Sequence, residues 1–339
     1  IELAKNKLLA SLLADHTNGK VGAFKTVVGL QGGAGVGKSE SIVQASKEFA
    51  ERLGLEFVET TDPSDKQLGF SIIQCSNVTA SDLAIPTPNA DKTELNYAFN
   101  LELLPRKGKG ILFVDELSQG DADVQKLLMA LIRQRSVNGY HLPKDWSIVC
   151  AYNRVQDHAG ANAVLKTLTD RITNKFNVEV DAGSWIKWAS ANNVHPHVMA
   201  FIKADNRMLC TLHGADRNDI GSTPRTITMM SDEYHNIKNG FYKDVGISDK
   251  DILSSVVGDE VGTAFSTFLK LVKKLPSVSE IIKNPDEVRV IEEGEDGCRA
   301  LITFGLANKV KNEKEFKNAL IYLGTVSYTH LTLPTNREV

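Results

Sequence analysis

Short apolar runs and helix-like segments alternate along the first half of the chain. Runs of the kind that form strands occur at TVVGLQ (26–31), FSIIQC (70–75), ILFV (111–114), SIVCAY (147–152) and FNVEV (176–180). Apolar residues at helical spacing occupy SESIVQASKEFAERLG (39–54) and ADVQKLLMALIRQRS (122–136). ILFV is apolar at every position, which suits a central parallel strand covered on both faces. The alternation predicts an α/β domain built on a parallel five-stranded sheet.

The pattern changes after about residue 182. Residues 184–275 have little strand signal and several helical stretches, and further helix follows around the acidic turn EEGEDG. Leucines near the start of the chain also recur at helical spacing. The expected domains are listed here in order: an N-terminal helix and linker at 1–24, an α/β core at 25–182, a mostly helical domain at 183–275 and a C-terminal helical extension at 276–326.

The last 13 residues, SYTHLTLPTNREV (327–339), do not read like the rest of the chain. They resemble the translated read-through of cloning or sequencing-adapter DNA. We therefore expect a non-native tail at 327–339 and give it no part in the fold.

Composition narrows the possible partners. The 339 residues are 42% hydrophobic and 24% charged with a net charge of −3, which gives no electrostatic reason to expect nucleic acid or an acidic membrane. No apolar stretch approaches the roughly 18 residues of a membrane span. Cys75, Cys150, Cys210 and Cys298 lie far apart without a CxxC pair. They favour reduced thiols in a cytoplasmic protein.

One motif, GGAGVGKS, stands directly between the first expected strand and a helix. It fits G-x-x-x-x-G-K-[ST] at every required position, with the residues Gly32, Gly33, Ala34, Gly35, Val36, Gly37, Lys38 and Ser39. Glycines let several backbone N–H groups converge on phosphate oxygens, and the helix adds the positive end of its dipole. Lys38 is placed to reach the β- and γ-phosphates, and the Ser39 hydroxyl to bind Mg²⁺. The motif predicts a phosphate-binding loop for ATP, and the dinucleotide pattern G-x-G-x-x-G has no match in this segment.

An acidic pair, Asp115 and Glu116, follows ILFV directly. α/β sheets bind their ligands at the carboxyl ends of the strands, which is where this pair lies. Asp115 is placed to hold Mg²⁺, largely through its waters, and Glu116 to polarise the attacking water. Together with Lys38 upstream, the pair predicts hydrolysis of the bound nucleotide.

The stretch GKGILFVDELSQGDADVQKLLMALIRQRSVNGYHLPKDWSIVCAYNRVQDHAG resembles the MoxR-like branch of AAA+ ATPases, in particular its bacterial and phage members. Shared features are an NGYxLP-like hairpin before a strand and a GNR- or YNR-like triplet after it. The resemblance covers about residues 25–300. It implies an AAA+ P-loop NTPase core followed by a helical lid. The segment VTASDLAIP (78–86) departs from the family pattern, because Ala84 stands where a glycine is usual.

The resemblance also implies roles for three polar residues. Asn153 in CAYNRV matches the sensor-1 residue, which lies between the attacking water and the γ-phosphate. Arg171 in LTDRI matches an arginine finger that serves the ATP of the neighbouring subunit. Arg225 in STPRT matches the sensor-2 arginine of the lid, which touches the γ-phosphate within its own subunit. The bland alternatives are an asparagine in a turn, an arginine at a helix end and a surface arginine.

Three other motifs bear on function, and none of them changes the prediction. LSQG (117–120) is similar to an ABC-transporter signature, but that signature precedes the acidic pair, whereas this one follows it. A GTPase would need an NKxD motif, and the sequence has none. His195 and His197 lack a third ligand at zinc-like spacing, so a surface turn before a helix is the favoured interpretation.

These features together predict an ATPase that works as a homo-oligomer, expected to be a hexameric ring. The family resemblance implies remodelling of a protein partner, with a von Willebrand factor A-type domain as the candidate. Two alternatives stay open: a nucleic-acid motor or loader, and a nucleotide-dependent binding switch with low turnover. The net charge speaks against nucleic acid as the partner.

Overall fold

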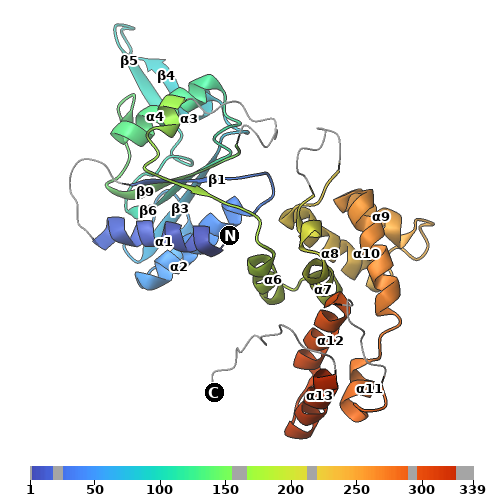
Figure 1. Cartoon of the computed structure of the whole chain (residues 1–339). Helices are drawn as coiled ribbons and strands as arrows, with labels where there is room; N and C mark the ends of the chain where they lie inside the picture. The colour runs from blue at the N-terminus through green and yellow to red at the C-terminus, as the bar shows by residue number, and fades with distance from the viewer. Residues whose placement is uncertain (1, 18–25, 155–165, 212–219, 289–295, 326–339) are drawn as a thin grey trace. The chain divides into compact units, whose positions relative to one another are not determined.

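The computed structural model describes residues 2–17, 26–154, 166–211, 220–288 and 296–325 (Figure 1). The chain divides into two compact units, which are described separately. The first comprises Ile1–Asp181 and His213–Arg217, and the second comprises Ala182–Leu212 and Asn218–Val339. The finer domain boundaries expected from the sequence stay predictions, and the proposed non-native tail lies outside the described residues.

The first unit is built on a parallel sheet of six strands in the order β10-β1-β9-β6-β3-β2. The strands are β1 (Val27–Gln31), β2 (Glu56–Glu59), β3 (Gln67–Gln74), β6 (Lys109–Asp115), β9 (Asp145–Tyr152) and β10 (Asn174–Asn177). The expected parallel α/β sheet is confirmed, with one strand more than expected. The additional strand is β2 at the edge of the sheet, whose sequence EFVE has two apolar residues between two glutamates.

Strand length and polarity vary across this sheet. The three strands β3, β6 and β9 have seven or eight residues each and are mostly buried, whereas the edge strands β2 and β10 have four each. The edges read EFVE and NKFN, so a charged or amide residue stands at both ends of each edge strand. Long apolar strands are thus interior and short polar ones close the two sides.

Helices cover both faces of the sheet (Figure 1). On one face, α1 (Glu2–Thr17) and α2 (Lys38–Arg52) pack against each other, and their leucines, isoleucine and phenylalanine join a core with alternate residues of β1, β3, β6 and β9. On the other face, α4 (Ala122–Gln134) buries Val124, Leu128 and Leu131 against the remaining strand residues. This three-layer arrangement fixes the carboxyl ends of β1, β6 and β9 side by side.

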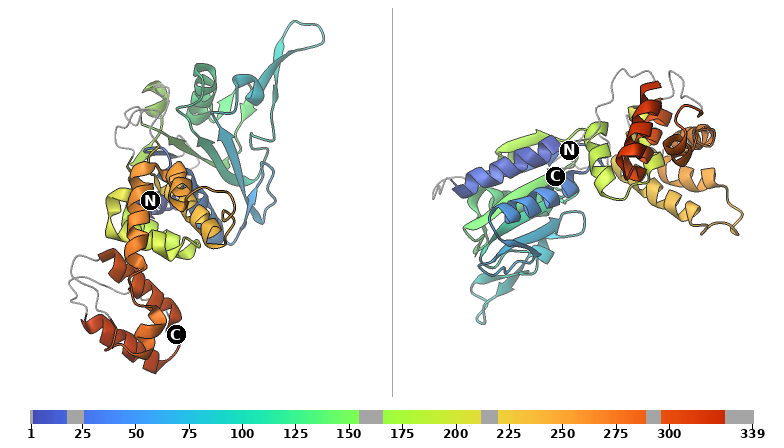
Figure 2. Two further views of the ribbon diagram at one scale, coloured as in Figure 1. Left: turned by 90° about the vertical axis from the view of Figure 1, so that its right-hand side faces the viewer. Right: turned by 90° about the horizontal axis from the view of Figure 1, so that it is seen from below.

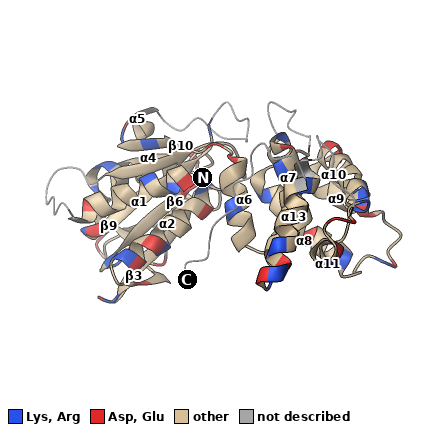
Figure 3. Cartoon of the chain, turned by 60° about the horizontal axis from the view of Figure 1, so that its bottom comes forward, with Lys and Arg blue, Asp and Glu red and all other residues tan. Residues whose placement is uncertain are grey.

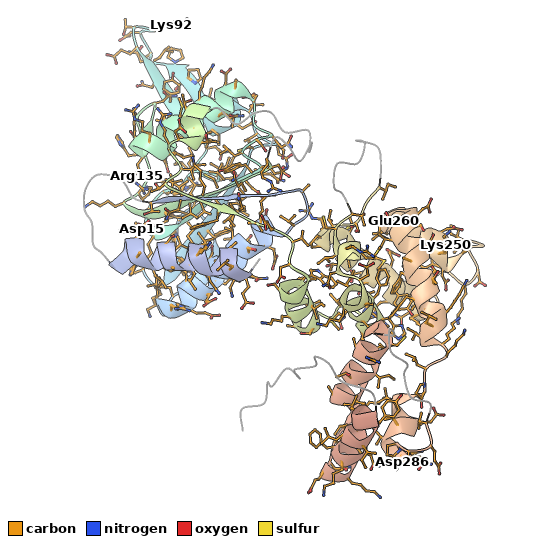
Figure 4. The ribbon with its side chains drawn as sticks, in the orientation of Figure 1. Asp15, Lys92, Arg135, Lys250, Glu260 and Asp286 are labelled. Atoms are coloured by element: carbon orange, nitrogen blue, oxygen red, sulfur yellow. The ribbon has the colours of Figure 1, made fainter. Side chains whose placement is uncertain are left out.

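Two antiparallel hairpins extend the first unit. A short helix, α3 (Ala80–Leu83), leads into β4 (Ala84–Pro88), which pairs with β5 (Leu95–Phe99). Lys92 lies at the tip of that hairpin, which Figures 2 and 4 show extending away from the sheet. Ala84 has φ −152°, an extended backbone that does not require the glycine usual in the family that the sequence resembles. The second hairpin joins β7 (Ser136–Val137) to β8 (Tyr140–His141), as the NGYxLP-like segment implies.

The second unit is helical throughout its described part. Its helices are α6 (Ala182–Ala191), α7 (Pro196–Ala204), the 3-10 helix η2 (Asn206–Leu209), α8 (Pro224–Lys238), α9 (Asp249–Val257), α10 (Asp259–Val272), α11 (Val278–Lys283), α12 (Asp296–Lys309) and α13 (Glu313–Thr325). An aromatic cluster of Phe201, Tyr234, Phe265 and Phe268 joins α7, α8 and α10, with ring centroids 5.2–6.3 Å apart. Edge-to-face and offset contacts of this kind stabilise a core beyond the area they bury.

His195 ends the turn before α7 and caps that helix. Its Nδ1 accepts a hydrogen bond from the backbone N–H of His197 at 3.0 Å, and Pro196 occupies the first helical position. The rings of His195, His197 and His235 lie together beside Tyr234, and the Tyr234 hydroxyl is 2.9 Å from Nδ1 of His197. The expected turn before a helix is present, but the histidines are half-buried in it instead of lying at the surface.

Acidic and basic residues are interspersed along the helices of both units (Figure 3). Within the described ranges, none of the helices combines the length and apolar character that crossing a bilayer requires.

Candidate phosphate-binding and hydrolysis site

The loop Gly32–Ser39 connects β1 to α2 at the carboxyl edge of the sheet. Gly35 and Gly37 have φ of 69° and 91°, in the left-handed region that glycine enters without a steric cost. Gly37 also occupies the N-cap of α2, and no side chain caps that helix. The first N–H groups of α2 are therefore left to a ligand, and an anion is the ligand that they and the helix dipole favour.

Gly32 is fixed by a close approach of the backbone beyond β10. A Cβ at this position would lie 2.5 Å from the carbonyl oxygen of Val178. The backbone N–H of Val178 also donates to the Gln31 carbonyl at 2.8 Å. Gly32, at the start of the loop, is thus required by packing as well as by the motif. The other loop residues differ in exposure: Val36 is part of the core and Ala34 is exposed.

The Lys38 side chain folds back over the loop. Its buried Nζ donates to the carbonyl oxygens of Gly32 and Gly33 at 2.9 and 2.7 Å, and to Oδ1 of Asn153 at 2.7 Å. A lysine ammonium offers three donors, and these contacts hold it inside the loop where phosphate oxygens would lie. Lys38 and Asn153, predicted from separate motifs, therefore meet in the structure.

Ser39 and Asp115 also meet. The Ser39 hydroxyl donates to Oδ2 of Asp115 at 2.8 Å, which joins the first turn of α2 to the end of β6. Burial raises the pKa of Asp115, while the hydrogen bonds from Ser39 and from the Glu116 backbone, together with the Lys38 charge, partly offset the rise. A hydroxyl and a carboxylate in contact are the oxygen donors that Mg²⁺ accepts, usually with several of its waters.

Glu116 has an unusual backbone for its residue type. Its φ is 50°, and its N–H donates to Oδ1 of Asp115 at 2.8 Å. Left-handed backbone costs a non-glycine residue about 1–2 kcal/mol, and such strain is concentrated at functional sites. The half-buried carboxylate accepts no hydrogen bond from the described residues, so it is available to a water or another ligand.

Arg171 lies in the turn after α5 (Lys166–Thr169) and before β10. Its Nη1 donates to the carbonyl oxygen of Thr167, and its buried Nε has no hydrogen-bond partner in the part of the chain that is described. Its hydrogen bonds reach only residues within four positions of it, and among the described residues none joins it to Lys38, Asp115 or Asn153. Its role as an arginine finger stays a prediction.

Arg225 belongs to the second unit. Thr223 caps α8 with a hydrogen bond from the Thr226 N–H at 3.2 Å, and Pro224 and Arg225 form the first turn, where Arg225 is exposed. A cation in the first turn opposes the helix dipole, so this arginine does not stabilise its own helix. That placement is consistent with a role toward a ligand, and the sensor-2 role stays a prediction.

Two residues of the site carry no sequence signal of their own. Ser118, inside the LSQG segment, is fully buried, and its Oγ accepts a hydrogen bond from the backbone N–H of Asn153 at 3.3 Å. Cys75, just beyond β3, lies next to the acidic pair. Burial, and then the charges of Asp115 and Glu116, raise its pKa to about 12. A thiol kept neutral in this way is a poor nucleophile, so Cys75 has a packing role at the site and takes no part in the chemistry.

The residues present fit a nucleoside triphosphate with Mg²⁺. The loop provides uncapped N–H groups and a buried ammonium, and the Ser39–Asp115 pair supplies oxygen donors beside them. Glu116 and Asn153 lie at the ends of neighbouring strands β6 and β9. The arrangement brings phosphate binding and a candidate base to one edge of the sheet.

Comparisons with known proteins give a distant likeness. No protein-family model matches the sequence, and no curated protein matches it significantly. Among solved structures, a variant of RuvB from Thermotoga maritima is 16% identical, with 84% of this chain and 76% of that chain covered and a TM-score of 0.44. NtrX from Brucella abortus, in complex with ADP, is 13% identical, with 94% and 63% covered and a TM-score of 0.42. These TM-scores are too low to assign a family or a role.

The chain's own geometry decides the fold. A parallel sheet covered by helices carries a Gly-rich loop after its first strand, and the Lys38, Ser39 and Asp115 side chains meet there. It is a P-loop NTPase fold.

Proposed function

We propose that the protein binds ATP with Mg²⁺ and hydrolyses it. The observation that carries the proposal is the pair of contacts Lys38–Asn153 and Ser39–Asp115, at 2.7 and 2.8 Å. Four polar side chains from three segments distant in sequence converge beside uncapped helix N–H groups. Buried polar groups gather in this way at sites that bind and transform charged ligands.

The residues then have distinct tasks. Backbone N–H groups of residues 32–39 bind the phosphates, and the Lys38 ammonium moves from its carbonyl acceptors to the β- and γ-phosphate oxygens. Ser39 and Asp115 would hold Mg²⁺, which neutralises charge on the phosphates when bound. Asn153 orients groups at the γ-phosphate. Glu116 accepts a proton from the attacking water while the oxygen of that water bonds to the γ-phosphorus and the bond to the β-phosphate oxygen breaks, leaving ADP and phosphate.

The finer part of the proposal is an AAA+ ATPase of the MoxR-like branch. Its support is the sequence resemblance, the hairpin β7–β8 before β9, and the P-loop unit followed by a helical one. In this proposal the chain forms a ring in which Arg171 reaches the ATP of the neighbouring subunit. Hydrolysis then remodels a protein partner. A partner with a von Willebrand factor A-type domain rests on the resemblance alone.

Replacing the candidate base tests the catalytic assignment. Glu116→Gln keeps size and polarity but removes the proton acceptor, so turnover of Mg²⁺-ATP should fall about 10²–10⁴-fold while nucleotide affinity stays within a few-fold. Steady-state phosphate release and nucleotide titration measure the two quantities. Glu59→Gln, the same change at the exposed end of the edge strand β2, is the matched control. Normal turnover in Glu116→Gln would remove the assignment.

A further inference from the structure

The loop after Asp115 is fastened to the end of β9 at two points. The backbone N–H of Leu117 donates to the Ala151 carbonyl at 3.0 Å, and the backbone N–H of Asn153 donates to Oγ of Ser118 at 3.3 Å. The first bond is between main-chain groups and survives any side-chain change. The second depends on the serine hydroxyl.

Ser118 is a polar residue at a position where packing favours an apolar one. It is 0% exposed, as is the preceding Leu117. A buried hydroxyl is unfavourable unless it forms hydrogen bonds, and alanine would occupy nearly the same volume. The bond to the Asn153 N–H is therefore the physical reason for a serine here.

The same short segment carries the candidate base. The Gln119 N–H donates to the Glu116 carbonyl at 2.7 Å and closes a tight turn, which Glu116 enters with its left-handed φ of 50°. Ser118 is the third residue of that turn. Glu116 and Ser118, which holds the Asn153 N–H, thus belong to the same tight turn, two residues apart.

Asn153 has a second attachment that the ligand is expected to displace. Its Oδ1 accepts a hydrogen bond from Lys38, and in the proposed mechanism Lys38 turns to phosphate. Once Lys38 has turned, the Ser118 bond and the strand itself are what hold Asn153 in place. The Ser118 hydroxyl then determines how precisely the side-chain amide of Asn153 is oriented while water attacks.

We propose that Ser118 is a positioning residue. By holding the main-chain N–H of Asn153, it couples the loop of Glu116 to the side-chain amide of Asn153 during hydrolysis. The inference rests on the proposed ATPase function and goes beyond it, since it assigns a hydrolysis role to a residue outside the recognised motifs. In this proposal Ser118 acts through Asn153, by its bond to the Asn153 main-chain N–H, and not by binding the nucleotide.

A double-mutant cycle with the full chain tests this role. Turnover of Mg²⁺-ATP and the Kd of a non-hydrolysable ATP analogue are measured for wild type, Ser118→Ala, Asn153→Ala and the double variant. Ser118→Ala should lower kcat about 10-fold, because a small misplacement of a catalytic group is costly, and change Kd by less than about two-fold. In the Asn153→Ala background the same change should have no further effect on kcat, because the amide that it positions is gone.

Two further variants separate positioning from packing. Ser118→Cys keeps the size of the side chain but replaces the oxygen with a weak sulfur acceptor, so it should match Ser118→Ala and provides the test if the alanine variant fails to fold. Ser46→Ala removes a hydroxyl that is equally buried, in the middle of α2, and should keep wild-type kcat.

The outcomes are distinct. Equal losses from Ser118→Ala with and without Asn153 would show a purely structural effect and overturn the inference, as would an unchanged kcat in both Ser118 variants. Either result leaves the ATPase proposal standing, because wild type still hydrolyses ATP. A wild-type chain that binds Mg²⁺-ATP but never hydrolyses it would remove both.

Discussion

The two units hold their candidate site residues in different ways. In the first, Lys38 is hydrogen-bonded to Asn153 and Ser39 to Asp115, which joins the start of α2 to the ends of β9 and β6. In the second, Arg225 is exposed on the first turn of α8, against the dipole of its own helix. The first set is shaped by contacts within the unit. No comparable set of contacts among the described residues explains the position of Arg225.

Under the proposed function, this difference separates groups that bind the nucleotide from groups that respond to it. Groups that bind phosphate must be in place before the ligand arrives, and a folded sheet edge preorganises them at little entropic cost when the ligand binds. Groups that sense the nucleotide or complete the catalytic site need to reach the site only when ATP is bound. Arg171, whose side chain donates to the nearby Thr167 carbonyl, belongs with Arg225 in this proposal although it lies in the first unit.

Removing Lys38 breaks the preassembled set and should have the largest effect. Lys38→Ala deletes a buried ammonium and leaves the Gly32, Gly33 and Asn153 acceptors without it, so ATP affinity should fall about 100-fold or more and turnover should vanish. Calorimetric titration with Mg²⁺-ATP measures the loss. Lys47→Ala, on the exposed side of the same helix, should bind like wild type. Wild-type affinity in Lys38→Ala would mean that the nucleotide binds elsewhere.

Mixing experiments test whether Arg171 acts between subunits. Arg171→Ala alone should lose about 10³-fold in turnover and keep its nucleotide affinity, as expected of a finger that contacts the transition state. Added to wild type, it should depress activity below the average of the two proteins, because each altered subunit disables a neighbour's site. Arg225→Ala, which would act within its own subunit, should give the simple average. Averaging by both variants would favour the low-turnover switch over the ring.

The smallest effect concerns the histidine cluster of the second unit. Burial, and then the charges of His197, His235 and Lys238, lower the pKa of His195 to about 3, and burial and Lys238 lower that of His197 to about 4. Unfolded histidines take up protons below about pH 6.5, whereas the folded pair stays neutral. Stability is therefore complete above that pH and is lost as the pH falls toward 4.

Thermal unfolding of the full chain measures this loss. Both rings are partly exposed, so solvent screening limits the change to on the order of 3 °C between pH 7.5 and 5.5. His195→Asn keeps an acceptor for the His197 N–H and should flatten the pH dependence. An unchanged slope in that variant would place the pH-sensitive groups elsewhere.

Much of the fold follows from local patterns. ILFV is apolar at every position and forms the centre of β6, and the glycines of the loop are needed where φ is positive or where Val178 approaches. β2 escaped prediction because a four-residue edge strand with two glutamates has neither a long apolar run nor buried neighbours on both sides. The hairpin β4–β5 contains two prolines, which usually argue against a strand.

The candidate site was predictable to a similar degree. Motif spacing indicated Lys38, Ser39, Asp115 and Glu116, because their chemistry dictates residue types at fixed offsets. Ser118 could not be found this way, since its role depends on a contact with residue 153, which the sheet brings near. The left-handed backbone of Glu116 is likewise invisible in the sequence, because nothing local requires it.

The short polar edges of the sheet bear on the behaviour of the protein in solution. β6 and its neighbours have the β-propensity and low charge of segments that assemble into cross-β aggregates when exposed. β2 and β10 shield them with eight residues, among them Glu56, Glu59 and Lys175, which discourage edge-to-edge pairing of two molecules. Unpairing either four-residue edge uncovers the backbone of a neighbouring interior strand. The solubility of the first unit therefore depends on two of its shortest elements.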